Sequence, residues 1–177
     1  MRYAVVTFPD VPTRGIESVR RRFDPQHGRV APHITLVFPT SLTVASEPLF
    51  GHLRHVAAHQ EPFPIRLHGL RRESTYWLVL DVPEGAAQIR DLHDALYTGP
   101  LAASLRQDIP YLPHVTLGVF GRAATQTKPS SAETRWQEAW TAATELSLDF
   151  ACMVRRISLL TIAETQDITI AGEFELA

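Results

Sequence analysis

The chain has 177 residues, of which 45% are hydrophobic and 20% are charged, and its formal net charge is -2 at pH 7. This size and composition favour one globular domain over residues 1–177 and exclude a disordered or fibrous protein. The near-neutral balance of charge excludes a generally basic nucleic-acid coat, although an anion site needs only local charge. A single cysteine, Cys152, excludes a disulfide framework and a cysteine-rich zinc site.

No apolar run approaches the roughly 20 residues that a membrane helix needs. The N-terminal segment 1–12 contains a short apolar run that ends at Pro9, which is typical of a first strand and not of a signal peptide. We therefore expect a cytoplasmic protein that has no membrane partner. Residues 1–30 hold six Arg against three acidic residues, so this end of the chain is the better charged for binding an anion.

Hydrophobic periodicity and breaker residues predict a mixture of strands and helices along the chain. Strands are predicted at 3–8, 33–38, 63–70, 75–82, 114–120, 148–162 and 168–174. Helices are predicted at 16–23, 47–59, 86–97 and about 136–143, with a surface loop at 121–131. Residues 71–74 are expected to be the turn of a hairpin that joins strands 63–70 and 75–82.

Two short segments repeat in the two halves of the chain. Segment 31–39 reads APHITLVFP and segment 112–120 reads LPHVTLGVF, so that His114 follows His33 by 81 residues. The shared pattern Pro-His-(Ile/Val)-Thr-Leu is expected by chance at roughly 0.0007 occurrences in a chain of this composition. The repeat predicts a duplicated α+β unit whose two segments lie near a pseudo-twofold axis.

The strand period gives this repeat a chemical meaning. Because side chains at i and i+2 of a strand point to the same face, His33 shares a face with Thr35 and His114 shares a face with Thr116. Two such strands would bring two imidazoles and two hydroxyls to one cleft. In-line displacement at phosphorus needs a proton acceptor on one side and a proton donor on the other, and imidazoles suit both tasks near neutral pH.

The segments PHITL and PHVTL resemble the two His-x-Thr motifs of the 2H phosphoesterase superfamily, and segment 20–39 is similar to its bacterial 2′-5′ RNA ligases. The resemblance implies an α+β fold of two interleaved lobes, with two antiparallel sheets flanked by helices around a central cleft with pseudo-twofold symmetry. It also implies that His33 is the proton donor, that His114 is the proton acceptor, and that neither metal nor cofactor is needed. Thr35 and Thr116 would bind the phosphate. The symmetry leaves the acid and base assignments open to exchange.

The same resemblance implies hydrolysis of a 2′,3′-cyclic phosphate on RNA 3′ ends or small cyclic nucleotides by a monomer, with 2′-5′ ligation as the reverse chemistry. One alternative is a binding module for RNA ends or nucleotides that keeps the cleft without turnover. The other is a metal hydrolase that uses His52, His55 and His59, which share a predicted helix. Their place on the polar shoulder of that helix favours a solvated face.

Other side chains near the motifs are candidates for contact with the substrate. Arg29 and Arg122 flank the two motifs and could reach a phosphate. Phe8 and Tyr111 lie near strand ends and could stack on a base, with packing in the core as the alternative for each.

Three further features have mainly structural interpretations. The run Arg20-Arg21-Arg22 is interpreted as the solvated face of a helix, with contact to an RNA backbone as the alternative. Tyr76 and Trp77 alternate along a strand, so that one is expected in the core and the other at the surface. Cys152 lies in an apolar strand and is interpreted as a small core residue.

Overall fold

The computed structural model describes residues 1–42, 46–74, 76–120 and 129–177. Its strands are β1 (Arg2–Thr7), β2 (Ile34–Thr40), β3 (Phe63–His68), β4 (Leu70–Glu73), β5 (Trp77–Asp81), β6 (His114–Val119), β7 (Asp149–Val154), β8 (Arg156–Ile162) and β9 (Ile168–Glu175). Its helices are α1 (Arg14–Phe23), α2 (Ser46–Ala57), α3 (Ala86–Leu96), α4 (Pro129–Glu145) and the short 3-10 helix η1 (Gly99–Ser104). The predicted α+β class is confirmed.

The strands form a seven-stranded sheet in the order β4-β5-β6-β2-β1-β8-β9 and a two-stranded sheet of β3 and β7. Neighbouring strands are antiparallel throughout. From the centre of the large sheet outward, β2-β1-β8 on one side corresponds to β6-β5-β4 on the other. Strand β4 follows the first motif along the chain but pairs with β5, and β8 follows the second motif but pairs with β1. The two halves of the chain therefore exchange strands around the predicted pseudo-twofold axis.

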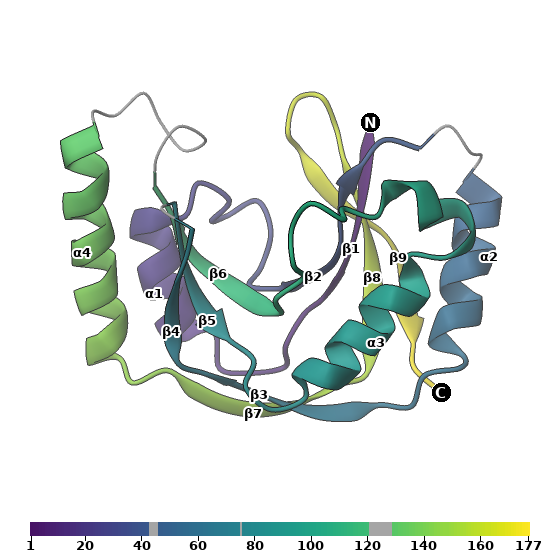
Figure 1. Cartoon of the computed structure of the whole chain (residues 1–177), viewed down its shortest axis with the longest axis horizontal. Coiled ribbons are helices and arrows are strands. Elements are labelled where there is room, and N and C mark those ends of the chain that lie inside the picture. The colour runs from purple at the N-terminus through teal and green to yellow at the C-terminus, as the bar shows by residue number, and fades with distance from the viewer. Residues whose placement is uncertain (43–45, 75, 121–128) are drawn as a thin grey trace.

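The helices follow the same exchange. Helix α1 packs on β6 and α4, and helix α3 packs on β2 and α2. Figure 1 shows α1 and α4 beside β4, β5 and β6, while α2 and α3 flank the other half of the sheet. The main core lies between helices and sheet, and it contains Ile34, Leu36, Val115 and Leu117, none of which is exposed. Because strand side chains alternate, His33, Thr35, His114 and Thr116 lie on the opposite face of the sheet.

That opposite face carries a smaller apolar cluster in the half formed by β1 and β8. Ala4 and Val6 of β1 are buried there against Leu160 and Ile162 of β8, and Phe8, Val30 and Ile168 pack over them. Val30 belongs to the segment that connects α1 with β2. This segment therefore folds back over the sheet on the side of the motif residues.

The predicted hairpin of 63–70 with 75–82 is wrong in its pairing. Strand β3 pairs with β7 in the small sheet, whereas residues 71–73, predicted as a turn, belong to β4 and pair with β5. Gly69 separates β3 from β4 with a φ of 85°. A backbone with positive φ is readily adopted by glycine, and here it allows the chain to leave one sheet and enter the other.

Two other predicted elements differ from the structure. The predicted strand 148–162 divides at Arg155 into β7 and β8, which lie in different sheets. The predicted helix at 136–143 is longer, because α4 begins at Pro129. Of the predicted loop 121–131, residues 121–128 lie outside the described residues.

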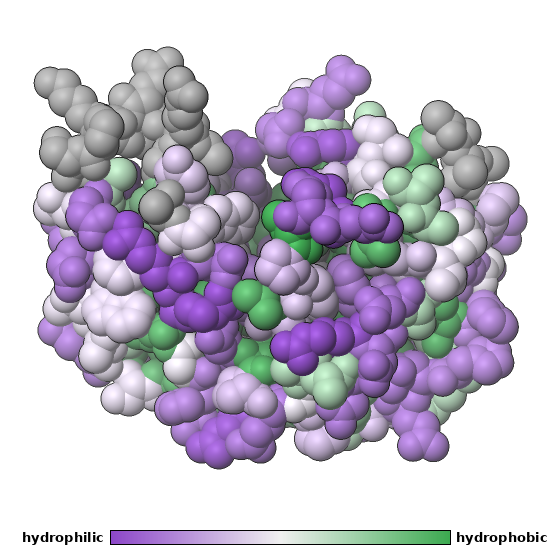
Figure 2. All heavy atoms as spheres, in the orientation of Figure 1, coloured by the Kyte–Doolittle hydropathy of each residue, from purple (hydrophilic) through white to green (hydrophobic). Residues whose placement is uncertain are grey.

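The face of the protein drawn in Figure 2 is mainly polar. In Figure 2 hydrophilic residues cover most of the visible face, and hydrophobic residues form small separate patches.

Tyr76 and Trp77 are 46% and 38% exposed, so the prediction that one of them is buried is wrong. They lie where the chain enters β5, after the turn from edge strand β4. Within the ranges given above, no helix is long and apolar enough to cross a membrane.

Candidate active site

The two motif strands meet at the centre of the large sheet. Ile34 of β2 pairs with Val115 of β6, and this is the pair through which the two halves of the described sheet are joined. In an antiparallel pair, the residue before one partner lies opposite the residue after the other. His33 thus lies opposite Thr116, and Thr35 lies opposite His114. The structure brings the four predicted residues together, and all four side chains are half-buried.

The two imidazoles are held in the same way. The Nδ1 atom of His33 lies 2.8 Å from the carbonyl oxygen of Ala31, and the Nδ1 atom of His114 lies 2.7 Å from that of Leu112. Because a carbonyl oxygen can only accept, Nδ1 carries the proton in both rings. In the neutral rings each Nε2 atom is then the acceptor, and it is the nitrogen left for a substrate.

Burial is the main influence on both motif histidines, and it lowers the pKa of each ring below its ordinary value. The hydrogen bonds to the carbonyl oxygens partly oppose this shift in pKa. The positive charge of Arg20 further lowers the pKa of His33, and that of Arg71 lowers the pKa of His114. Both rings are therefore predominantly neutral at pH 7 without a bound anion.

The surroundings of the two rings differ. Phe8 contacts His33 edge to face, with ring centroids 6.1 Å apart, and its contact with a substrate stays a prediction. At the equivalent place in the other half, Asp81 of β5 pairs with His114, and Arg71 donates from Nε to Asp81 at 2.9 Å. Directly opposed residues share one face of a sheet, so the Asp81–Arg71 ion pair lies beside His114. The sequence alone does not reveal this ion pair, since only the strand register brings Asp81 beside His114.

Tyr111 connects the second motif to the first. Its hydroxyl donates to the carbonyl oxygen of Thr35 at 2.8 Å, and burial raises its pKa well above the ordinary value. Its ring stacks on His93, with centroids 3.7 Å apart and planes 7° apart. The Nδ1 atom of His93 in turn donates to the carbonyl oxygen of Leu36 at 2.7 Å. One face of the Tyr111 ring is thus covered, and its predicted stacking on a base stays a prediction.

Of the two arginines predicted to contact a phosphate, Arg29 lies within the described residues and Arg122 lies outside them. The Arg29 side chain is exposed and makes no ion pair with any residue in the described ranges. It borders a cavity of about 260 Å³ whose lining is Glu17, His27, Gly28, Arg29, Val30 and Ala31. Contact of either side chain with a phosphate stays a prediction.

One part of the predicted arginine face is wrong. Arg21 and Arg22 are exposed, but Arg20 is only 1% exposed. Arg20 is buried because it forms ion pairs with Glu17 and Asp24, three residues before it and four after it. These spacings bring side chains together on one side of a helix, and they were visible in the sequence.

The three histidines predicted on one helix do not form a metal site with other described side chains, and His59 lies beyond the end of α2 at Ala57. His52 Nε2 lies 2.9 Å from the carbonyl oxygen of Leu96, while His55 and His59 are exposed with their rings 4.3 Å apart. Across residues 1–42, 46–74, 76–120 and 129–177, no three His, Cys, Asp or Glu side chains gather in a way that could hold a metal ion.

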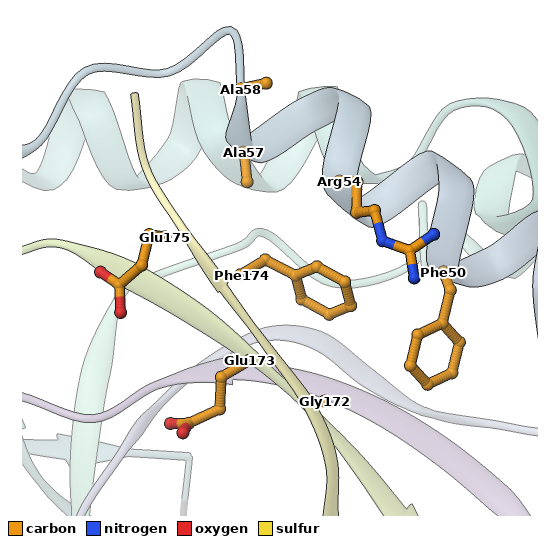
Figure 3. Close-up of a pocket in the computed structure, with 8 residues that line it drawn as sticks. All are labelled: Phe50, Arg54, Ala57, Ala58, Gly172, Glu173, Phe174 and Glu175. Atoms are coloured by element: carbon orange, nitrogen blue, oxygen red, sulfur yellow. The ribbon is translucent and has the colours of Figure 1, made fainter.

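A larger cavity of about 330 Å³ lies away from the motifs. Figure 3 shows Phe50 and Arg54 of α2 above β9, which carries Phe174. Strand β9 is at the edge of the sheet, three strands from β2, and Phe174 belongs to the core on the helix side. The cavity is therefore separate from the face that carries the motif histidines.

An interleaved α+β fold with a histidine and a threonine on each of two central strands defines the 2H phosphoesterase class. A family model described as the 2'-5' RNA ligase superfamily matches residues 8–166, a range that includes both motifs. The chain belongs to this superfamily.

Known proteins of similar sequence carry phosphoesterase names. "Putative phosphoesterase BH1439" of Halalkalibacterium halodurans is 28% identical over 125 residues, which are 67% of this chain and 70% of that protein. A protein of Bacillus pumilus, "Putative phosphoesterase", is 31% identical over 123 residues, which are 66% of this chain and 69% of that protein.

Solved structures share the fold over almost the whole chain. TT0787 of Thermus thermophilus matches with a TM-score of 0.63 and 16% identity, over 99% of this chain and 98% of that one. E. coli LigT complexed with 3'-AMP matches with a TM-score of 0.60 and 21% identity, again over 99% and 98%.

Proposed function

We propose that this protein is a metal-independent phosphoesterase that hydrolyses 2′,3′-cyclic phosphates on RNA 3′ ends or on small nucleotides. The observation that carries the proposal is the matched pair of imidazoles. His33 and His114 flank the one pair that joins β2 and β6, and each has its Nδ1 atom bound to a backbone carbonyl. Two Nε2 atoms are thereby left to act on one phosphate from two sides.

In the proposed reaction His114 is the general base and His33 is the general acid. Nε2 of His114 takes a proton from water as the water oxygen attacks phosphorus. Nε2 of the protonated His33 gives its proton to the ribose oxygen as the bond from that oxygen to phosphorus breaks. The products are a phosphate monoester and a free ribose hydroxyl. The hydroxyls of Thr35 and Thr116 donate hydrogen bonds to non-bridging oxygens, and the local symmetry allows the acid and base roles to be exchanged.

The free and bound states differ in the charge of the rings. Burial lowers the pKa of both histidines in the free protein, which suits the base but not the acid. A phosphate anion between the rings favours their charged forms and raises both pKa values. Substrate binding would thus help to protonate the acid. With a ribose hydroxyl as nucleophile in place of water, the same groups would catalyse 2′-5′ ligation.

Several parts of the proposal rest on similarity to known proteins. LigT of E. coli has been crystallised with 3'-AMP and with ATP, which supports a ligand of nucleotide size for this site. Phe8 and Tyr111 would contact the base or ribose, and Arg29 and Arg122 would contact phosphate. The proposal also includes a monomer of one domain with two interleaved lobes, located in the cytoplasm.

A product assay tests the proposed function. The protein is incubated with each of the four 2′,3′-cyclic nucleotides and with short RNAs that end in a 2′,3′-cyclic phosphate. We expect multiple turnovers to a phosphate monoester, with loss of turnover in His33→Ala and in His114→Ala. Binding at one ligand per chain without product would instead support the binding module.

A further inference from the structure

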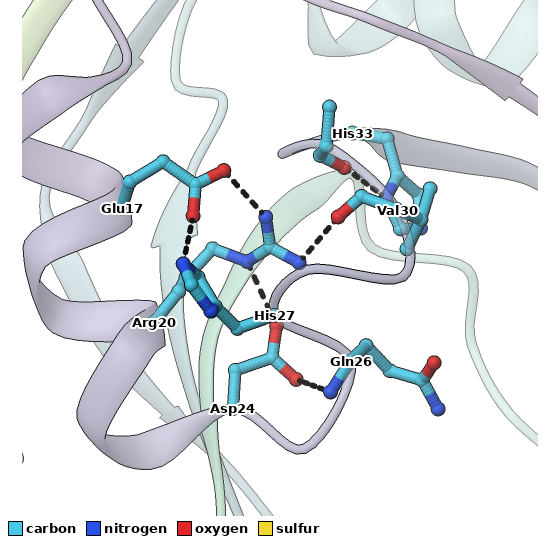
Figure 4. Close-up of polar contacts among 8 residues, drawn as sticks. Glu17, Arg20, Asp24, Gln26, His27, Val30 and His33 are labelled. Carbon is cyan, nitrogen blue, oxygen red and sulfur yellow. Dashed lines mark hydrogen bonds and ion pairs between the residues drawn. The ribbon is translucent and has the colours of Figure 1, made fainter.

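Arg20 occupies the centre of a buried polar network at the end of α1, shown in Figure 4. Its Nε atom donates to Asp24 Oδ2 at 2.8 Å, and one terminal nitrogen donates to Glu17 Oε1 at 3.0 Å. The other terminal nitrogen donates to the carbonyl oxygen of Val30 at 2.9 Å. The planar guanidinium thus satisfies three acceptors that lie in three directions, which a lysine ammonium on a single flexible stem does not reproduce.

This network holds the segment that leads into the first motif. The second carboxylate oxygen of Asp24 accepts the backbone N–H of Gln26 at 2.8 Å, and His27 Nε2 lies 3.1 Å from Glu17 Oε2. Arg20 thus binds the Asp24 carboxylate at the start of the segment and the Val30 carbonyl near its end, and it also binds Glu17 within α1. The next carbonyl in the chain, that of Ala31, accepts the Nδ1 proton of His33.

We propose that Arg20 is a positioning residue for His33. By holding the Val30 carbonyl, it fixes the peptide group whose neighbouring carbonyl sets the tautomer and the orientation of the imidazole. The effect of Arg20 on the rate rests on the proposed function of His33. Its effect on the tautomer and orientation of the His33 ring does not.

Stability alone is a weak reason to bury this network. The Asp24 carboxylate and the guanidinium must be removed from water, and Glu17 is partly removed. Apolar replacements of similar volume often match a buried ion pair in stability. A guanidinium does give a geometry that apolar packing does not give. Val30 also packs on the small apolar cluster, and this contact is the competing means by which the segment could be held.

The second motif provides an internal reference, because the segment before its histidine is anchored by a tyrosine hydroxyl. The acceptor for His114 is the carbonyl of Leu112, and the preceding residue, Tyr111, is anchored by its hydroxyl to Thr35. Removal of Arg20 should therefore change His33 and leave His114 as it was.

The test is the replacement Arg20→Met, compared with Arg21→Met as a matched control on the exposed side of the same helix. Nitrogen NMR of the imidazoles in the full chain reports the tautomer of each ring. In Arg20→Met we expect His33 to lose its preference for the Nδ1 proton, while His114 keeps it. Turnover of a 2′,3′-cyclic nucleotide should fall by roughly 10–100-fold in kcat with little change in KM, the usual scale for a supporting residue. Arg21→Met should match the wild type in both measurements.

Unchanged His33 nitrogen shifts in a folded Arg20→Met protein would overturn the proposal, as would equal changes in His33 and His114. If the Met variant does not fold, Arg20→Lys takes its place. Its retained charge can pair with Asp24, but it leaves the Val30 carbonyl unbound, so the His33 shifts should still change and unchanged shifts would again overturn the proposal. The NMR result does not depend on turnover. A failure of the proposed function can therefore be distinguished from a failure of the positioning role of Arg20.

Discussion

Ile34 and Val115 pair across the antiparallel strands β2 and β6, and each of them directly follows a motif histidine. The pair therefore joins equivalent positions of the two repeats and lies on the pseudo-twofold axis. Both side chains are fully buried on the helix side. Ile34 and Val115 thus form the core contact at this point. Their pairing also places the two imidazoles on the other face of the sheet.

Truncation of this pair should be costly. We expect Ile34→Ala to lower the free energy of unfolding by about 2–5 kcal/mol and Ile34→Val by about 0.5–1.5 kcal/mol, the ranges for buried positions that lose methyl groups. Ile170→Ala is the control, because Ile170 is 54% exposed on edge strand β9 and should change stability by less than about 0.5 kcal/mol. Denaturant unfolding measures all three. A loss in Ile34→Ala no larger than that in Ile170→Ala would show that the central pair contributes little.

Each motif histidine should be essential for turnover but not for folding. His33→Ala and His114→Ala are each expected to lower kcat by roughly 10²–10⁴-fold, the scale of general acid–base catalysis. The double variant should be only slightly worse than either single variant, because the two rings act in one step. His55→Ala, at an exposed position of α2, is the control and should keep full activity. Near-normal turnover by both single variants on every active substrate would refute the acid–base pair.

The two threonines should act through their hydroxyls. Thr35→Ala and Thr116→Ala are expected to weaken binding of the transition state by about 1–3 kcal/mol each, because each removes a donor to a charged oxygen. Thr→Ser at the same positions keeps the donor and should cost less. The ratio kcat/KM gives the comparison. If Ser is as damaging as Ala, packing of the threonine methyl group is the property that matters.

The motif residues could be predicted from the sequence because their information is local and repeated. A period of two places His33 with Thr35 on one face, and the second copy at His114 and Thr116 made chance a poor explanation. The apolar residues between them, such as Ile34 and Val115, follow the same period and are buried as it requires. The similarity of the two segments also predicted the pseudo-twofold relationship.

Other features depend on contacts between distant parts of the chain. The sequence around Gly69 predicts two strands and a reversal, but it does not reveal that β3 pairs with β7. The register that places Asp81 beside His114 is likewise non-local. The burial of Arg20 was not predicted, because a run of three arginines is usually solvated. The spacing of Glu17 and Asp24 around it was the signal that could have identified a buried ion cluster.

Acid should destabilise the fold before its carboxylates titrate. Burial lowers the pKa of His33, His93 and His114 below the ordinary value of 6.5. The unfolded chain therefore binds more protons as the pH falls below 6.5, so that stability is full above this value and decreases through the lower pKa values of the folded state. Unfolding by denaturant between about pH 8 and about pH 5 measures this slope.

His93→Gln tests one contribution to that slope. The amide can still donate to the Leu36 carbonyl but cannot titrate, so the loss of stability with acid should be smaller than in the wild type. The exposed acids with lowered pKa values, such as Asp108 with a pKa of about 2, titrate below this range and do not confuse the result. A stability that is constant or rises toward pH 5 would contradict the assignment of neutral buried rings.

The most direct test of the proposed chemistry is the rate of hydrolysis of a 2′,3′-cyclic nucleotide against pH, measured with and without excess EDTA. One imidazole must be neutral while the other is protonated, so kcat/KM should be bell-shaped in pH. The limbs of kcat should lie at higher pH than those of kcat/KM, because the bound phosphate raises both pKa values. We expect the same profile in EDTA. Activity that is lost in EDTA and restored by zinc or manganese would contradict a metal-independent pair of histidines.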